Sequence, residues 1–332
     1  MVEKRIVVTG GSGFVGTNLV SFFVDQGWEV LNLDIAAPRN REQLSFWRDV
    51  DLLDRARLIR ETRAFMPSVF LHFGARTDLN ERRTLGGYAA NIEGVRNVIQ
   101  AIRSAPSVER AIFASSQLVC RLGYAPRDEY DYQPYTLYGQ SKALSERIIR
   151  TAEDMGAVWT IVRPTSLWGP WFDVPYKSFF LAIAKNLYVH PGGKTTLKQW
   201  GYIGNVVFQI WKLIQARAEL VHKKVFYLAD YQPMDLHDFA DKVQIALGAR
   251  PIRTIPAKIL RAAAIIGDMA KKLGWKNPPL TSFRYINLVT SEVHDLEPLR
   301  KIVGPLPYTV EQGINCTVEW LQGQSVGASA RM

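Results

Sequence analysis

A tyrosine and a lysine stand four residues apart in the segment YTLYGQSKALSE, residues 135–146. The segment has a helical pattern, so Tyr138 and Lys142 would share one helix face, with their Cβ atoms roughly 5–6 Å apart. A tyrosine side chain has a pKa of about 10, so it can act as a base at neutral pH only if nearby positive charge lowers that pKa. Taken alone, such a pair is more often a surface feature; in the right surroundings it is an acid–base device.

A serine can supply the third group of this device. The run IFASSQLVC, residues 112–120, reads as the end of a parallel strand. Ser116 would then lie at the carboxyl edge of the sheet, where ligands bind in open α/β folds. Its hydroxyl could hold a substrate oxygen while Tyr138 takes the alcohol proton and the carbinol hydride passes to a nicotinamide. The three residues together predict alcohol oxidation or its reverse.

The rest of the chain supplies the elements that would position these groups. Short apolar runs alternate with helical patterns, and the predicted strands of the first half span residues 5–10, 29–34, 68–75, 109–116 and 158–169. Such alternation indicates βαβ units and a parallel sheet covered on both faces. We therefore predict an α/β fold: a doubly wound parallel sheet of the Rossmann type, with a smaller C-terminal substrate lobe.

A glycine-rich segment follows the first predicted strand and opens the first predicted helix, residues 17–26. In TGGSGFVG, residues 9–16, the glycines that matter are Gly10, Gly13 and Gly16. They permit a tight turn, a close approach of backbone N–H groups to a pyrophosphate, and close packing of helix on strand. The helix N-terminus then faces the negative charge. This context predicts that the segment binds a dinucleotide.

An aspartate at the end of the second predicted strand bears on which dinucleotide binds. Asp34 lies 18 residues beyond Gly16, where a carboxylate accepts hydrogen bonds from the ribose hydroxyls and repels a 2′-phosphate. The prediction is NAD rather than NADP. Arg39 and Arg41 follow closely and could accommodate a phosphate, so NADP stays open as the alternative.

We place the domain boundary after Gly169, where the alternation weakens. Residues 1–169 would form the NAD-binding domain with the catalytic helix, and residues 170–322 a mixed α/β substrate-binding lobe with some elements returning to the main sheet. The small polar residues of 323–332 predict a flexible tail. Within the lobe we predict a strand at 224–230 and helices at 176–186, 205–220, 235–248 and 256–276.

Four motifs in this order resemble those of the extended short-chain dehydrogenase/reductases, the NAD-dependent nucleotide-sugar epimerase/dehydratase group. TGGSGFVG is similar to the TGxxGxxG signature and LYGQSK to YxxxK, while NIEGVRNV (91–98) and RPTSLWGP (163–170) resemble two further segments. The resemblance covers nearly the whole chain. It implies that Ser116, Tyr138 and Lys142 are catalytic. It also implies that the cofactor is bound by Ser12, Phe14, Val15, Asp51, Leu52, Phe73, Gly74, Ala75, Asn91, Ser115 and Pro164, with Tyr138 and Lys142.

The resemblance narrows the chemistry through residues that are missing. Dehydratases of the family carry an Asp-Glu pair after the catalytic hydroxyl, because loss of water next to a ketone needs a further acid and base. Here Ser116 is followed by Gln117 and Leu118, which cannot ionise. The prediction is an NAD-dependent sugar-nucleotide 4-epimerase. The alternatives are a dehydrogenase or reductase of a small or hydroxysteroid-like alcohol, and a non-catalytic NAD-binding protein.

The residues that would contact the substrate are less clearly marked. The resemblance implies Ser166 and Lys198, and Arg76 and Arg284 are further candidates, with a plain surface residue as the alternative for Arg284. Ser166 replaces the family's usual asparagine, and Lys198 replaces an arginine, which keeps the charge but loses the bidentate geometry. These departures leave the identity of the nucleotide open.

Composition sets the remaining expectations. The net charge of +10 is concentrated after residue 170, which suits an anionic small substrate or a solvated basic face. Cys120 and Cys316 are the only cysteines, so we expect no disulfide framework, no metal site and a cytoplasmic location. We expect a small-molecule substrate, a nucleotide sugar, with neither nucleic acid nor membrane as a partner. The basic segment 256–276 has an apolar centre, and we interpret it as a helix that packs on the second lobe. The resemblance implies a homodimer.

Overall fold

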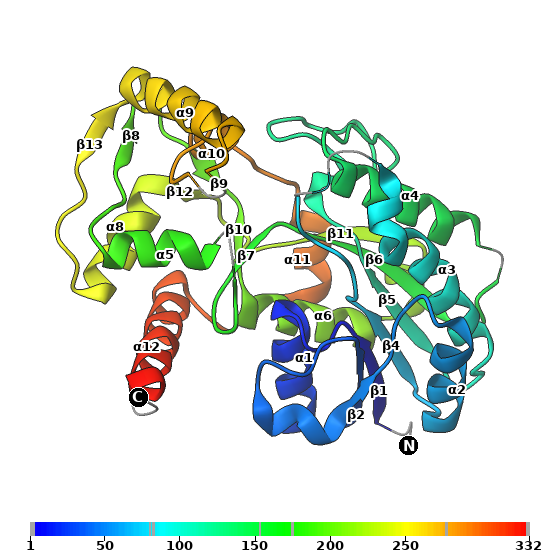
Figure 1. The fold of residues 1–332 in the computed structure, drawn as a ribbon. Helices are drawn as coiled ribbons and strands as arrows, with labels where there is room; N and C mark the ends of the chain where they lie inside the picture. The colour runs from blue at the N-terminus through cyan, green and yellow to red at the C-terminus, as the bar shows by residue number, and fades with distance from the viewer. Residues whose placement is uncertain are drawn as a thin grey trace.

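The computed structural model describes residues 4–79, 81, 84–152, 154–173, 176–275 and 278–329. Its centre is a sheet of seven parallel strands in the order β11-β6-β5-β4-β1-β2-β3 (Figure 1). The strands are β1 (Arg5–Thr9), β2 (Glu29–Asp34), β3 (Trp47–Asp49), β4 (Val69–His72), β5 (Arg110–Ala114), β6 (Val158–Pro164) and β11 (Lys224–Leu228). The chain leaves β1 toward one edge and then returns to build the other, so the order reverses between β1 and β4. Ligands bind at such a switch point, beside the carboxyl ends of the strands.

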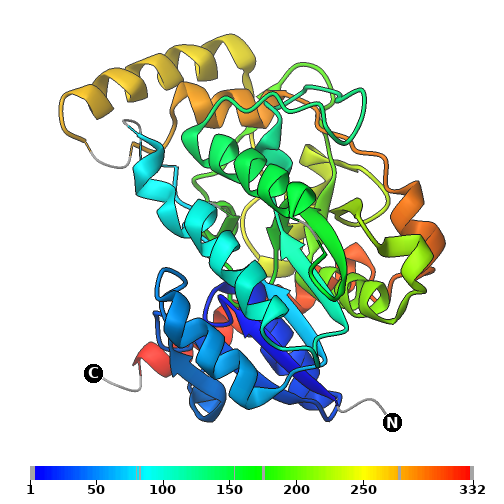
Figure 2. The ribbon, with the colours of Figure 1, turned by 90° about the vertical axis from the view of Figure 1, so that its right-hand side faces the viewer.

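Helices cover both faces of the sheet, as alternating side chains of a strand require. Ile6 and Val8 of β1 belong to one apolar cluster, whereas Val7 belongs to another on the opposite face. The first cluster includes α1 (Phe14–Asp25), α6 (Ile203–Gln215) and α11 (Glu297–Val303). The second face is covered by α2 (Arg55–Phe65), α3 (Ala89–Arg103) and α4 (Leu137–Thr151), which lie side by side (Figure 2). The predicted doubly wound α/β fold is confirmed.

The second part of the chain packs around aromatic side chains rather than around a large sheet. Its elements include α5 (Tyr176–Ala184), α8 (Leu236–Leu247), α9 (Ala257–Lys272), α10 (Ser282–Val289) and α12 (Val310–Ser329), whereas α7 (Ala218–Val221) contacts β6 and β11 of the main sheet. Short strand pairs join β7 (Ser166–Trp168) to β10 (Trp200–Tyr202), β9 (Leu197–Lys198) to β12 (Met234–Asp235) and β8 (His190–Gly192) to β13 (Thr254–Pro256). Trp168, Phe180 and Phe239 are buried in the same cluster as Ile6, so this part shares its core with one face of the sheet.

The differences from the predicted elements have local causes. The predicted strand 158–169 is two strands, since β7 leaves the main sheet after Thr165 to pair with β10. The predicted helix 205–220 is divided into α6 and α7 by the extended backbone of Ala216 (ψ 153°). Strand β3 was missed because two of its three side chains are exposed, so it has no apolar run.

Two further expectations meet the described structure. Helix α12 continues to Ser329, so residues 323–329 of the predicted tail have helical backbone, while residues 330–332 lie outside the described residues. Where the boundary between the two domains falls stays a prediction. Within the described ranges, none of the helices is both long and apolar enough to cross a bilayer.

Candidate active site

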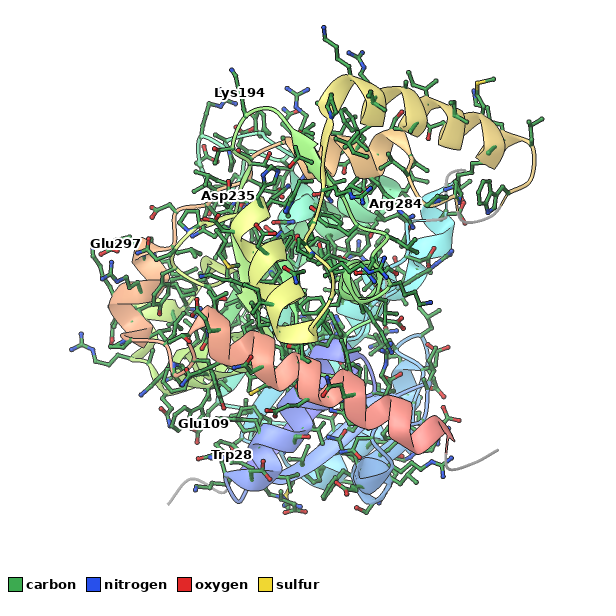
Figure 3. All side chains as sticks on the ribbon, turned by 90° about the vertical axis from the view of Figure 1, so that its left-hand side faces the viewer. Trp28, Glu109, Lys194, Asp235, Arg284 and Glu297 are labelled. Atoms are coloured by element: carbon green, nitrogen blue, oxygen red, sulfur yellow. The ribbon has the colours of Figure 1, made fainter. Side chains whose placement is uncertain are left out.

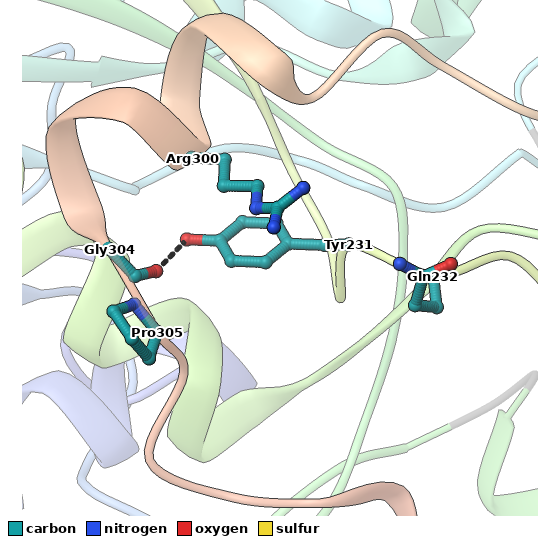
Figure 4. A pocket seen from close by; sticks show the side chains of 5 residues that line it. All are labelled: Tyr231, Gln232, Arg300, Gly304 and Pro305. Atoms are coloured by element: carbon teal, nitrogen blue, oxygen red, sulfur yellow. Dashed lines mark hydrogen bonds between the residues drawn. The ribbon is translucent and has the colours of Figure 1, made fainter.

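One cleft, of about 1060 Å³, brings together most of the predicted site residues at the carboxyl edge of the sheet. Its lining includes Gly10, Ser12, Gly13, Phe14, Val15, Gly16, Asp34, Asp51, Leu52, Phe73, Gly74, Ala75, Arg76, Ser115, Ser116, Tyr138, Lys142 and Pro164. A smaller hollow of about 300 Å³ contains none of these residues (Figure 4). There the Tyr231 hydroxyl donates a hydrogen bond of 2.8 Å to the carbonyl of Gly304. The large cleft is therefore the candidate active site.

The glycine segment at the start of α1 has the geometry that a pyrophosphate requires. Gly10 has a φ of 74°, and a Cβ atom there would lie 2.5 Å from the amide nitrogen of Gly74. A Cβ atom on Gly16 would collide with the Gly10 carbonyl oxygen. Gly13 caps α1 without a side chain, so the first N–H groups of the helix stay open toward the cleft. The segment fits the diphosphate of a dinucleotide.

Asp34 lies at the end of β2, beside the glycine segment. Its carboxylate accepts hydrogen bonds from the backbone N–H groups of Ser12 (3.1 Å) and Ala36 (3.0 Å), and burial raises its pKa. Arg39 also lines the cleft, but its guanidinium forms an ion pair with Asp173 at 3.3 Å. The charge of Arg39 is therefore partly neutralised, which favours NAD over NADP.

Ser116, Tyr138 and Lys142 meet because α4 lies close to the end of β5. Thr136 caps α4 by accepting a hydrogen bond of 3.0 Å from the Gly139 N–H group. A Cβ atom on Gly139 would collide with the Leu118 carbonyl oxygen, so this glycine allows the close approach. The Ser116 hydroxyl lies near the Tyr138 phenol, close enough to lower the pKa of that phenol. The three predicted catalytic groups thus lie in one cleft.

Burial controls the pKa values of the tyrosine and the lysine. Burial raises the pKa of Tyr138 to about 12, and the nearby Ser116 hydroxyl opposes this shift. The expected lowering of this pKa by a neighbouring ammonium is not found in the protein alone. Burial lowers the pKa of Lys142 to about 8, and its Nζ donates a hydrogen bond of 2.7 Å to the Ala114 carbonyl. At neutral pH the phenol keeps its proton and the lysine keeps its charge.

A buried ion pair behind the cleft holds α4 against β6. Arg163 donates two hydrogen bonds of 2.8 Å to the Glu146 carboxylate, one from Nε and one from Nη2. The side chains of Arg163 and Glu146 are 1% and 0% exposed. Glu146 also accepts a hydrogen bond of 2.5 Å from the Ser115 hydroxyl. The sequence analysis missed this positioning role. Glu146 follows Lys142 by one helical turn on the same face, and this spacing was the available signal.

One residue predicted for the cofactor lies behind the lining instead of in it. Asn91 is fully buried, and its side chain accepts a hydrogen bond from the Arg76 N–H group (2.8 Å) and donates to the Ser141 hydroxyl (2.9 Å). These bonds tie α3 to α4 and to the segment after β4. The geometry indicates that Asn91 positions the cleft wall.

Three of the four predicted substrate residues also lie outside the lining. Ser166 accepts a hydrogen bond of 2.6 Å from the Tyr176 hydroxyl. Lys198 is 1% exposed, and its Nζ donates to the Asn287 side chain at 3.0 Å. Arg284 donates to the backbone carbonyls of residues 278 and 279. These contacts occupy the three side chains within the protein, and only Arg76 reaches the cleft.

Residues that the sequence analysis did not select form the substrate half of the cleft. They are Leu79, Gln117, Leu118, Leu122, Tyr135, Tyr176, Phe283 and Asn287. The acidic residues in the described lining are Asp34, Asp51 and Asp173, all on the cofactor side. Gln117 follows Ser116, and its side chain contacts His294 (3.2 Å) and donates to the Glu292 carboxylate (3.5 Å), which lies behind the lining. The described lining of the substrate half is therefore largely apolar and contains no carboxylate, although Glu292 lies behind Gln117.

Comparison with known proteins now identifies the family. The model of the NAD-dependent epimerase/dehydratase family matches residues 6–229, about two thirds of the chain. The chain belongs to the NAD-dependent epimerase/dehydratase family. It is therefore an enzyme, NAD is its cofactor, and the cleft has the features that NAD requires.

Individual relatives of this family member are distant but cover almost its whole length. It is 25% identical over 329 residues to N-acetyl-alpha-D-glucosaminyl-diphospho-ditrans,octacis-undecaprenol 4-epimerase of Escherichia coli O157:H7, covering 96% of both chains. It is 24% identical to a 3-beta-hydroxysteroid dehydrogenase of Mycolicibacterium neoaurum, covering 93% of this chain and 89% of the relative. The fold matches a UDP-glucose 4-epimerase of Thermotoga maritima with a TM-score of 0.74 at 18% identity, covering 97% and 99% of the two chains.

Proposed function

We propose that the protein is an NAD-dependent 4-epimerase of a sugar that carries a diphosphate. The observation that carries this proposal is the meeting of Ser116 and Tyr138 at the NAD cleft, with no carboxylate lining the described substrate half. Proton and hydride exchange at an alcohol needs only the two hydroxyl groups and the cofactor. Loss of water needs an added acid and base. The 4-epimerase activity named for the Escherichia coli relative and for the structural neighbour supports this choice.

The roles of the side chains follow from their positions. The Ser116 hydroxyl would hold the oxygen of the reacting alcohol, and the Tyr138 hydroxyl would exchange a proton with it. NAD, when bound, accepts a hydride and adds positive charge near the phenol. Because burial alone raises the pKa of Tyr138 to about 12, we infer that the phenol becomes an effective base only in the complex. Lys142 would supply further positive charge from the same helix face.

The diphosphate could be attached to a nucleoside or to a polyprenol. Both groups occur in the names of similar proteins, the first in the structural neighbour and the second in the Escherichia coli relative. The test incubates the enzyme and NAD separately with UDP-N-acetylglucosamine and with polyprenyl-diphospho-N-acetylglucosamine. The sugar released by acid is then analysed for its configuration at C4. Conversion in one arm identifies the carrier, and conversion in neither arm rejects the proposal.

A second candidate is a dehydrogenase or reductase of an apolar alcohol, such as a hydroxysteroid. The apolar side chains of Leu118, Leu122 and Phe283 in the substrate half favour it. Net formation of NADH from a 3β-hydroxysteroid, without epimerisation of any sugar, would establish this activity. Epimerisation without net NADH would exclude it. The homodimer and the cytoplasmic location stay predictions.

A further inference from the structure

Helices α9 and α10 carry an apolar surface on the outside of the molecule. Helix α9 lies along the upper edge in Figure 1, with α10 against its inner side. The inner side of α9 buries Leu260, Ala264 and Gly267, and a Cβ atom on Gly267 would collide with the Leu280 carbonyl oxygen. The opposite side of α9 is therefore turned outward, away from the protein.

Large apolar residues occupy that outward side at helical spacing. Ile259, Ile266, Met269 and Leu273 follow one another at intervals of seven, three and four residues, which places them on one face. They are 58%, 66%, 58% and 87% exposed. Four further large apolar residues are exposed nearby in the chain, Trp275 after α9 and Phe283, Ile286 and Val289 on α10, with exposures of 55%, 41%, 50% and 38%. Large exposed apolar residues on two helices that pack on each other mark a candidate interaction site.

Basic residues outnumber acidic ones in the segment that carries the apolar residues. Residues 257–275 contain four basic residues, Lys258, Arg261, Lys271 and Lys272, and one acidic residue, Asp268. Asp268 accepts hydrogen bonds from the Ser282 N–H group, so its carboxylate faces α10. Exposed Lys194 lies at the same upper end of the molecule (Figure 3). An apolar stripe on a segment with a positive net charge matches the interfacial region of an anionic bilayer.

We call the exposed apolar residues of α9 and α10, together with Trp275, the α9–α10 face, and this face shares one residue with the active-site cleft. Phe283 belongs to both, and its ring stacks on that of Tyr135 with the centroids 6.3 Å apart. Leu118 and Leu122 line the same half of the cleft. A lipid surface on the α9–α10 face would therefore lie next to the substrate entrance.

We propose that the α9–α10 face docks the enzyme on an anionic phospholipid membrane, with the apolar residues entering the headgroup region and the basic residues contacting lipid phosphates. This reverses the expectation that a membrane is not a partner and that the segment 256–276 only packs on the second lobe. The proposal does not depend on which alcohol the enzyme oxidises.

The test measures binding of the full-length protein to vesicles, without any activity assay. Cosedimentation should show binding to vesicles of phosphatidylcholine with phosphatidylglycerol, and weaker binding to phosphatidylcholine alone or at high salt. The triple variant Ile266→Glu, Met269→Glu, Leu273→Glu should lower the partition coefficient about a hundredfold, because three apolar contacts become charged. The matched control changes three exposed apolar residues elsewhere, Leu187→Glu, Leu220→Glu and Ile245→Glu, and should bind like the wild type.

A second variant separates charge from apolar insertion. Lys258→Gln, Arg261→Gln, Lys272→Gln should remove the preference for phosphatidylglycerol and leave the weak binding to phosphatidylcholine. Thermal unfolding and NAD titration verify that every variant is folded. The proposal is overturned if the wild type does not bind anionic vesicles, or if the two triple glutamate variants bind equally. A third outcome also overturns it: the wild type does not bind vesicles but sediments as a dimer, and only the variant Ile266→Glu, Met269→Glu, Leu273→Glu is a monomer. The face would then bind a second copy of the chain.

Discussion

The cofactor half and the substrate half of the cleft differ in how they are built. The cofactor half comes from short segments at strand ends and from the start of α1, where Gly10 and Gly16 have no room for a side chain. The substrate half is assembled from segments far apart in the chain, such as Leu118, Tyr176 and Phe283. The cofactor half is fixed by backbone geometry, so its sequence is constrained. The substrate half is formed by side chains that can change without disturbing the sheet, so it can vary with the substrate.

Replacement of Tyr138, where the two halves meet, tests the comparison most strongly. Tyr138→Phe should lower kcat about 10³-fold, because the proton exchange with the alcohol is lost. The affinity for NAD should change little, since the phenol hydroxyl contacts Ser116 and not the glycine segment. Steady-state kinetics and NAD titration check the two expectations. Unchanged turnover would remove Tyr138 from the mechanism.

Breaking the buried pair behind the cofactor half should have the largest effect on stability. Arg163→Met leaves the Glu146 carboxylate buried without its bidentate partner, which should lower the free energy of unfolding by roughly 3–5 kcal/mol. Urea denaturation measures this change. The double variant Arg163→Met, Glu146→Leu should recover much of the loss, since no uncompensated charge stays buried. If the single and double variants are equally unstable, the cost comes from packing and not from charge.

The contrast between the halves also explains what could be predicted from the sequence. Gly10, Asp34 and Tyr138 lie in local patterns in which a turn, a strand end or a helical spacing fixes the role, and the structure brings them together in the cleft. Strands with continuous apolar runs were located to within a few residues for the same reason. Strand β3 has no such run, because two of its three side chains are exposed.

Contacts between segments that are far apart in the chain could not be predicted from the sequence. Lys198 matched a phosphate-binding position by order along the chain, yet its ammonium contacts Asn287, which is 89 residues away. Phe283 lines the cleft, although only the neighbouring Arg284 was considered as a substrate contact. No local spacing encodes either contact, because both depend on how α10 packs over the cleft.

The lowered pKa of Lys142 should make the stability of the protein depend on pH. This folded-state pKa of about 8 lies below the ordinary value of 10.5, since burial disfavours the charge. Between these two pKa values the unfolded chain binds more protons than the folded chain. The free-energy cost of burying the charged ammonium is fully present below pH 8 and decreases as the pH rises. Stability should therefore gain up to about 1 kcal/mol per pH unit from this group.

The variant Lys142→Met isolates that contribution. It should reduce the slope of unfolding free energy against pH in the window from about 8 to 10, where tyrosine ionisation is still limited. Lys301→Met, at an exposed position on α11, is the control and should keep the wild-type slope. Denaturation at a series of pH values in that window gives both slopes. Equal slopes in all three proteins would show that Lys142 is not held at a lowered pKa.

The smallest expected effect is a change in cofactor preference, and it tests whether the cofactor half and the substrate half act separately. Asp34→Ala removes the carboxylate that would face the adenosine ribose, so the preference for NAD over NADP should fall about tenfold. Arg39 should then limit any preference for NADP, because its guanidinium is held by Asp173. Phe283→Ala, at the other end of the cleft, is the matched control: it should raise the KM of the substrate and leave the cofactor ratio unchanged. If Phe283→Ala alters the cofactor ratio as much as Asp34→Ala does, the two halves are coupled and do not act as separate recognition surfaces.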